Sequence, residues 1–207
     1  MKSRSFFAAL ALVVASSASA ETIGVELFGA WTDPIANGNI RRLDATLRLS
    51  PRVRGGAGLS VFLGRGVSLS VSDSRGTIPV TLRANGGEPG RSHLSLEYRD
   101  AILRRVYGQS DLRGYAGLGI ALPAVRELRE VSSGGLTLFR AGTPDHPALI
   151  INTGADYRML PHIHLFADLK YEPYASTIEV RRVNYPLDDL EANVHLLVLA
   201  SGVSFRF

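Results

Sequence analysis

Apolar and polar residues alternate along most of the chain after its first twenty positions. In residues 163–172 one face carries Ile163, Leu165, Ala167, Leu169 and Tyr171, and the other carries His164, Phe166, Asp168, Lys170 and Glu172. The same alternation recurs in residues 22–31, 41–50, 92–99, 113–122, 149–158 and 194–206. A period of two indicates β-strands with one apolar face. Segments of about ten residues with this pattern are typical of the strands of transmembrane β-barrels.

The stretch 57–83 leaves the number of strands open. Its first half fits either one long strand kinked at residues 64–66 or a hairpin with a three-residue glycine loop. After residues 73–76 the apolar positions switch parity to Ile78, Val80 and Leu82, as a second hairpin requires. Two membrane hairpins give ten strands, whereas an extended hairpin outside the bilayer gives eight. We predict an all-β, transmembrane antiparallel β-barrel of eight strands, with ten strands as the alternative.

A period of two does not tell which face lies inside, because a secreted lipocalin-like barrel alternates with its apolar face inward. Loop lengths favour the membrane barrel: short links at 50–54 and 159–162 alternate with long ones at 123–148 and 173–193. The link 100–112 is long for the short-loop end. Aromatic residues near strand ends also fit the interfaces of a membrane barrel; they are Trp31, Tyr98, Tyr157, Tyr171, Phe205 and Phe207.

Both ends of the chain carry features of exported proteins. Residues 1–20 have the organisation of a cleaved signal peptide: Lys2 and Arg4, an apolar run, and small residues at 18–20. The mature domain is then 21–207. The last strand ends on Phe207, which we predict to be the assembly signal read by the barrel-assembly machinery. These features predict a protein of the bacterial outer membrane, with the lipid of that membrane as a partner.

Composition excludes several other classes. The chain has 23 Lys+Arg and 19 Asp+Glu, and loss of Lys2 and Arg4 leaves a net charge of only 21 − 19 = +2. This balance gives no reason to expect a nucleic-acid partner. There is no cysteine, so disulfides and thiolate metal sites are excluded. No apolar run after residue 20 is long enough for a transmembrane helix.

The second half of the chain resembles the OmpW family of outer-membrane proteins. Residues 113–119, Arg-Gly-Tyr-Ala-Gly-Leu-Gly, are similar to the family's strand motif Arg-Pro-Tyr-Val-Gly-x-Gly, and residues 202–207 are similar to its closing Gly-Val-Gly-Tyr-Arg-Phe. Residues 154–157, 160–162 and 168–171 resemble the hairpin between them. Similar features recur in small OmpA-like barrels. The resemblance implies a porin-like, eight-stranded barrel of a Gram-negative cell envelope that passes or binds small hydrophobic molecules.

The predicted inward face is charged rather than apolar. It carries equal numbers of cations and anions: Arg42, Asp44, Arg48, Glu97, Arg99, Asp168, Lys170 and Glu172. Because a buried unpaired charge costs several kcal/mol, and side chains fill a barrel of eight strands, we predict a lumenal polar network. Two functions remain open: an OmpW-like narrow channel or binding barrel for a small-molecule solute, and a structural or surface-exposed barrel that its own charges close.

An outer-membrane hydrolase similar to lipid A deacylases is a third possibility. His93, Ser95 and Glu97 share one strand face and supply the residue types of a nucleophile, a base and an acid. Their parity points them into the lumen, away from a lipid substrate, so we predict that the protein is not an enzyme. His146, His162, His164 and His195 show no metal-ligand spacing. We predict no catalytic site, no metal and no cofactor.

Overall fold

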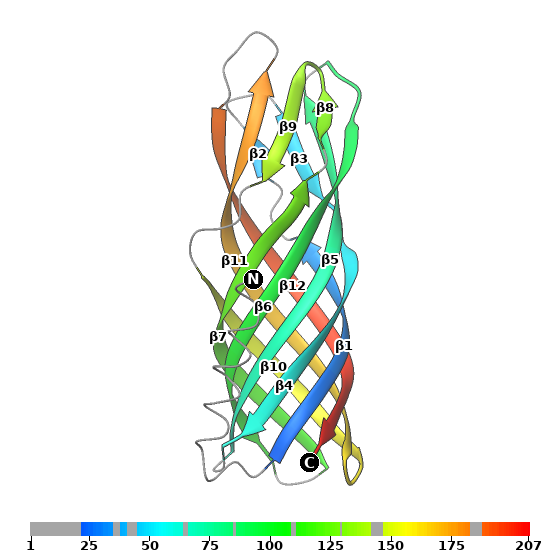
Figure 1. Cartoon of the computed structure of the whole chain (residues 1–207), viewed down its shortest axis with the longest axis vertical. Helices are drawn as coiled ribbons and strands as arrows, with labels where there is room; N and C mark the ends of the chain where they lie inside the picture. Colours follow the sequence, from blue (N-terminus) through cyan, green and yellow to red (C-terminus); the bar gives the residue numbers. More distant parts are fainter. Residues whose placement is uncertain are drawn as a thin grey trace.

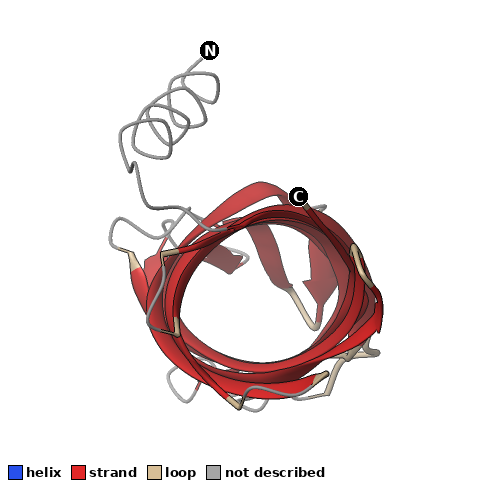
Figure 2. Ribbon diagram, turned by 90° about the horizontal axis from the view of Figure 1, so that it is seen from below, coloured by secondary structure: helices blue, strands red, loops and turns tan. Residues whose placement is uncertain are grey.

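Eight strands of the computed structural model close into an antiparallel ring. Its described residues are 22–34, 38–40, 45–63, 66–84, 86–108, 111–128, 130–141, 147–182 and 188–207. The ring consists of β1 (Thr22–Pro34), β4 (Arg52–Phe62), β5 (Val67–Ala84), β6 (Gly90–Tyr107), β7 (Leu112–Leu128), β10 (Ala148–Leu160), β11 (Ile163–Arg182) and β12 (Asp188–Arg206). It closes because β1 pairs with β12 and β10 pairs with β11 (Figures 1 and 2). The predicted eight-stranded fold is confirmed.

Four short strands lie at the end of the barrel opposite the C-terminus, which Figure 1 shows at the top. They are β2 (Gly38–Ile40), β3 (Ala45–Leu49), β8 (Val131–Ser133) and β9 (Leu136–Ala141). β3 and β4 pair with successive parts of β5 in the same direction. Between them the Ser50 N–H donates to the Pro79 carbonyl at 3.0 Å. Residues 50–51 therefore interrupt one line of strand, and the predicted short link at 50–54 is wrong.

The stretch 57–83 contains one hairpin, not two. A tight turn joins β4 to β5, and the Leu63 N–H donates to the Val67 carbonyl at 2.9 Å. β5 then continues through residues 73–76 and stays in register with β6 from Val67↔Arg105 to Leu82↔Gly90. β6 itself extends to Tyr107, so only residues 108–111 link it to β7. This short link removes the predicted exception at 100–112.

The parity switch in β5 is a change of environment within one strand. Its even-numbered positions line the interior throughout, beginning with Ser68, Ser70, Ser72 and Ser74 and ending with Ile78, Val80, Leu82 and Ala84, all buried. The inner face is therefore polar in the lower half of the strand and apolar in the upper half. Because the same face of β5 points inward throughout, the change in apolar parity after residues 73–76 requires no turn.

The whole barrel follows the same division. In the lower half apolar side chains point outward and remain exposed, forming a belt that includes Ile23, Val25, Leu27, Trp31, Leu59, Leu103, Leu118, Ile120, Leu149, Ile151, Leu165, Leu169, Leu199 and Phe205. In the upper half apolar side chains point inward and pack into one core, which includes Ile78, Val80, Leu82, Leu94, Leu96, Val131, Leu136, Leu138, Ile150, Leu196 and Val198. The outer surface of the lower half therefore suits contact with lipid, and the outer surface of the upper half suits contact with water.

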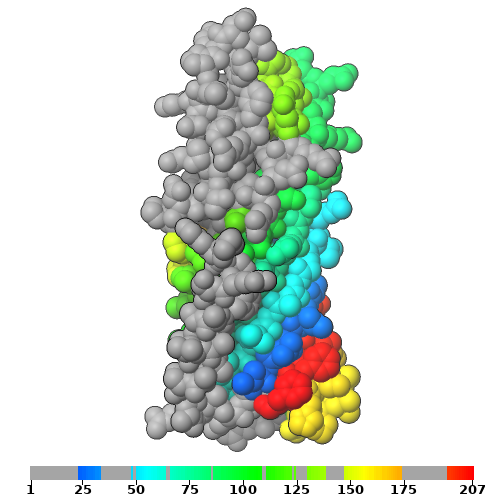
Figure 3. All heavy atoms as spheres, in the orientation of Figure 1, coloured from blue at the N-terminus to red at the C-terminus, as the bar shows by residue number. Residues whose placement is uncertain are grey.

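The lower end contains the short turns and the closing contact of the sheet. Figure 3 shows the start of β1 and the C-terminal strand side by side there. Among the described residues no helix is long and apolar enough to cross a membrane. The predicted signal peptide, residues 1–20, lies outside the described residues.

Candidate functional site

Buried ion pairs cross the lumen of the lower half at four successive levels. At the lowest level, the Asp156 Oδ2 atom on β10 lies 2.6 Å from the Arg206 Nη2 atom on β12. The same oxygen lies 2.9 Å from the Nδ1 atom of His164 on β11. All three side chains are buried. This group closes the lumen near the short turns.

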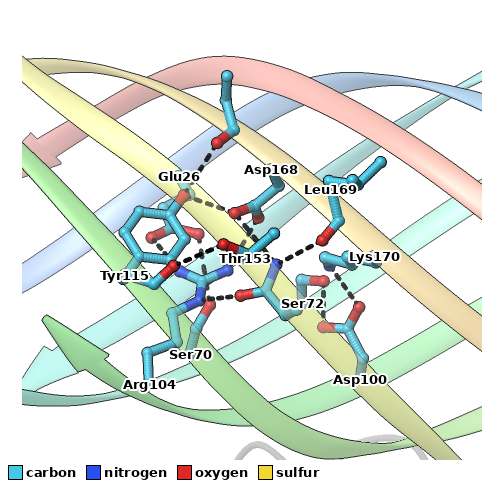
Figure 4. A network of polar contacts seen from close by, with 12 residues as sticks. Glu26, Ser70, Ser72, Asp100, Arg104, Tyr115, Thr153, Asp168, Leu169 and Lys170 are labelled. Atoms are coloured by element: carbon cyan, nitrogen blue, oxygen red, sulfur yellow. Dashed lines mark hydrogen bonds and ion pairs between the residues drawn. The ribbon is translucent and has the colours of Figure 1, made fainter.

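The second level is centred on Arg104 of β6 (Figure 4). Its Nη2 atom donates to the Asp168 Oδ2 atom at 2.9 Å, and its Nε atom donates to the Asn152 Oδ1 atom at 3.0 Å. Glu26 on β1 lies 3.7 Å away, from its Oε1 atom to Nη1 of the arginine. The Tyr115 hydroxyl donates to the other Asp168 oxygen at 2.5 Å. The contacts of this guanidinium group and of its partner Asp168 thus join five strands: β1, β6, β7, β10 and β11.

The third and fourth levels are two further ion pairs across the barrel. Lys170 on β11 donates to the Asp100 Oδ2 atom on β6 at 2.7 Å, and Ser72 on β5 donates to the second Asp100 oxygen at 2.5 Å. Above this pair, the Arg54 Nη2 atom on β4 donates to the Glu172 Oε1 atom on β11 at 3.1 Å. Directly beyond Arg54 the inner wall becomes apolar.

Aromatic rings support all four of these cations; at the lowest level the Arg206 guanidinium lies 4.4 Å from the centre of the Phe62 ring. The Arg54 guanidinium lies 4.2 Å from the centre of the Tyr98 ring, and the Arg104 guanidinium lies 4.8 Å from that of Tyr115. The Lys170 ammonium lies 5.8 Å from the centre of the Phe28 ring. Such contacts stabilise cations that have lost their water. They also fill the space beside each ion pair, which narrows any axial path.

A small cavity lies between the first and second levels. Its lining includes Ser60, Tyr115, Phe166, Ser204 and Arg206, and it has room for about one water molecule. The hydroxyls of Ser60 and Ser204 and the Nε atom of Arg206 have no hydrogen-bond partner among the described residues, so the lining suits a bound water. The cavity is too small to hold an organic solute.

Three of the predicted network residues occupy successive inward positions. Asp168, Lys170 and Glu172 are all buried, and each belongs to a different level of the ion-paired lumen. Their partners are Arg104, Asp100 and Arg54, none of which belongs to the predicted network. Arg42 and Asp44 lie outside the described residues.

The other three predicted network residues point outward, which differs from the prediction. Arg48 is exposed, and its register partner Thr81 lies on the outward face of β5. Glu97 and Arg99 occupy the odd-numbered positions of β6, whereas the inward positions include Leu96, Tyr98 and Asp100. All three residues belong to the part of the barrel whose apolar face is inside. The prediction assumed that the apolar residues of these segments face lipid. It therefore placed the polar residues in the lumen, whereas they lie on the outer face.

Sequence reasoning missed six charged residues of the lumen: Glu26, Arg54, Asp100, Arg104, Asp156 and Arg206. Glu26 and Asp156 stand on the polar face of segments whose faces were read correctly, so the alternation itself could have found them. Asp100 and Arg104 fall within the predicted link 100–112, so the alternation assigned neither residue to a strand face. Arg54 was hidden because 50–54 was read as a turn.

The described residues do not assemble a catalytic triad from His93, Ser95 and Glu97. All three stand on the outward face of β6, contrary to the predicted parity. The Ser95 hydroxyl lies 3.5 Å from that of Thr77, and the Glu97 carboxylate binds Arg99 at 3.1 Å and Arg75 at 3.2 Å. Within the described ranges no group of three or more His, Asp and Glu residues is arranged to hold a metal ion.

The C-terminal residue completes the ring. The Phe207 N–H donates to the Ile23 carbonyl at 2.9 Å, and the Ile23 N–H donates to the Phe207 carbonyl at 3.1 Å. The side chain is 77 % exposed on the outer surface. Pairing of the first and last strands thus extends to the final residue, where an assembly factor can reach the ring. Its role as an assembly signal remains a prediction.

Solved structures share this architecture. No family model matches the sequence, and no curated protein matches it. The outer membrane protein OprG from Pseudomonas aeruginosa superposes with a TM-score of 0.74 at 14 % identity, over 91 % of this chain and 97 % of that one. Neisserial surface protein A gives 0.51 at 16 % identity, over 90 % and 96 % of the two chains.

At these identities the likeness concerns the fold. OprG is an eight-stranded barrel of the OmpW family, the family that the motifs at 113–119 and 202–207 resemble. The comparisons therefore confirm the predicted fold class, an eight-stranded antiparallel β-barrel of the kind seen in outer-membrane proteins.

Proposed function

We propose that this protein is an outer-membrane barrel that binds small apolar molecules in the upper half of its lumen and conducts no ions along its axis. The observation that carries the proposal is the change in the inner wall beyond Arg54. Below this residue four buried ion pairs cross the lumen, and above it the described inward side chains are mainly apolar. The exposed apolar belt of the lower half supports a location in the outer membrane, with lipid around it.

The ion pairs argue against an axial channel. At each level cation and carboxylate side chains are at most 9 % exposed. Separating a buried pair leaves uncompensated charge at a cost of about 3–5 kcal/mol. A solute that follows the axis would have to open four such levels in turn. This arrangement favours a binding barrel over a through-channel.

The upper half offers a suitable surface for an apolar molecule. Leu82, Leu138, Ile150 and Leu196 converge there from four strands, and each is completely buried. A small apolar molecule that separates these side chains gains the same hydrophobic contacts that they make with one another. The wall of ion pairs beneath would then hold it in the upper half. The resemblance to the OmpW family supports this substrate class.

Two measurements on refolded protein test the proposal. In planar bilayers we expect no discrete single-channel currents. In lipid nanodiscs we expect a small apolar fluorophore, N-phenyl-1-naphthylamine, to bind above the level of empty nanodiscs. Leu196→Asn, on the inner wall, should weaken this binding at least tenfold. Leu197→Asn, next in the chain on the outward face, should leave it unchanged. Equal binding by both variants would refute an inner apolar site.

A closed structural barrel without transport is the second candidate. The burial of the apolar core favours this function, because the core side chains already pack against one another. Absence of fluorophore binding by the wild-type barrel, together with absence of current, would select this function. In either case we propose that Phe207 is the contact for the assembly machinery.

A further inference from the structure

Basic residues gather on the outer wall of β3, β5 and β6, directly above the apolar belt. We propose that this wall binds phosphorylated glycolipids of the outer leaflet through their head groups. The inference rests on the proposed outer-membrane location, but not on what the lumen binds. The wall is defined here by Arg48, Asp73, Arg75, Arg83, Arg91, Glu97 and Arg99.

The register of β5 and β6 shows where lipid contact ends. Val71 pairs with Ala101, and this is the last apolar pair at the outward register positions of the two strands, with Val71 itself 3 % exposed. The next outward pairs are Asp73↔Arg99 and Arg75↔Glu97. Successive outward pairs are about 7 Å apart along the strand. Both arginines therefore lie within the depth at which lipid phosphates are found.

Two carboxylates hold the arginines nearest the lipid without neutralising the wall. Glu97 lies 3.2 Å from the Nη2 atom of Arg75 and 3.1 Å from the Nη2 atom of Arg99. Asp73 lies 3.9 Å from Arg99. The Arg75 side chain nevertheless stays 74 % exposed. Because a guanidinium has five N–H donors in a planar fork, it can bind a carboxylate and still receive a phosphate.

The charge of the wall increases toward its upper end. From Asp73 upward, the described outward positions of β3, β5 and β6 carry five arginines and two acidic residues, a net charge of +3. Arg48 and Arg91 flank Thr81 in one cross-strand row. That row lies about 33 Å along the strand from Val71. A lipid that meets both levels must carry anionic groups on an extended head group, which is the chemistry of a phosphorylated glycolipid.

A binding assay in neutral detergent micelles tests the proposal. The probes are rough lipopolysaccharide, which carries phosphates on its lipid and core sugars, and the same material after dephosphorylation. The test variant is Arg48→Gln/Arg75→Gln/Arg91→Gln. The control is Arg158→Gln, an arginine with a half-exposed side chain at the opposite end of the barrel, paired with Asp111 at 2.6 Å. Heat-modifiable gel migration establishes that each barrel is folded.

We expect the wild type and the control to prefer the phosphorylated probe, and the triple variant to bind it at least about tenfold more weakly. The proposal is overturned if the triple variant binds like the wild type, if the control loses as much, or if dephosphorylation has no effect. Failure of the wild-type barrel to fold in micelles or lipid would instead reject the membrane location.

Discussion

The buried pair between Lys170 and Asp100 allows a quantitative test of the ion-paired lumen. We consider Lys170→Met, which shortens the unbranched side chain by one atom and removes its charge. The Lys170 Nζ atom lies 2.7 Å from Asp100, and the two side chains are 5 % and 4 % exposed. Without the ammonium, Asp100 retains only Ser72 among its described hydrogen-bond donors. An uncompensated buried carboxylate predicts a loss of about 3–5 kcal/mol in the free energy of unfolding.

The assay is equilibrium unfolding in urea of the barrel refolded into phospholipid vesicles. Leu169→Met is the matched control, because Leu169 is the neighbouring residue on the lipid-facing side and a swap of this kind costs less than about 1.5 kcal/mol. Lys170→Met/Asp100→Asn should recover most of the lost stability, because it removes both charges. We also expect Lys170→Met to raise the ionic leak through the barrel.

Two results would contradict this reasoning. One is a Lys170→Met barrel as stable as the Leu169→Met control, since the pair would then contribute nothing. The other is unchanged stability together with a shifted reversal potential. That combination would identify Lys170 as a selectivity residue of a working channel.

Three further predictions concern the ring itself. Deleting Phe207 removes the terminal hydrogen bonds to Ile23 and should lower the amount of protein in the outer membrane without affecting export; normal levels in fractionated membranes would disprove the assembly role. Leu165→Arg places charge in the belt and should cost roughly 2–4 kcal/mol near the midplane, as measured by urea unfolding in vesicles; a neutral effect would count against lipid contact there. Gly202→Ala should prevent closure, because a Cβ atom at this inward position meets the Leu27 carbonyl and Phe28, whereas Gly29→Ala points into open space and should fold normally. Equal gel migration of the two glycine variants would contradict the packing.

The strands of the lower half could be predicted from the sequence almost completely. In residues 163–172 Leu165 and Leu169 face outward as their alternation suggested, and the inward charges Asp168, Lys170 and Glu172 follow directly. In residues 194–206 Leu199 and Phe205 face outward, whereas Leu196 and Val198 face inward. The tight turn at 161–162 also coincides with a proline and a polar residue.

The orientation of the strand faces in the upper half could not be predicted, because a period of two does not tell which face lies inside the barrel. Residues 92–99 alternate as regularly as the others, but Leu94 and Leu96 point inward there, and Arg48 of β3 is exposed. The available signal was the switch at residues 73–76. A change of parity with charged residues at the new outward positions marks the exit of a strand from lipid as well as it marks a turn. The cross-barrel partners Arg54 and Arg104 became visible only once the register placed them opposite Glu172 and Asp168.

The continuous β5 strand has a consequence for what meets the protein from outside the cell. Between Arg75 and Ala84 the strand runs about 30 Å beyond the belt, which a strand tilt near 40° reduces to a height of about 23 Å. The inward side chains of this segment pack into the apolar core, which holds the segment in place. The described residues 86–89, which follow this segment, therefore lie about that far above the belt. A large molecule that approaches the barrel along its axis from this end would therefore meet residues 86–89 before it reaches the belt.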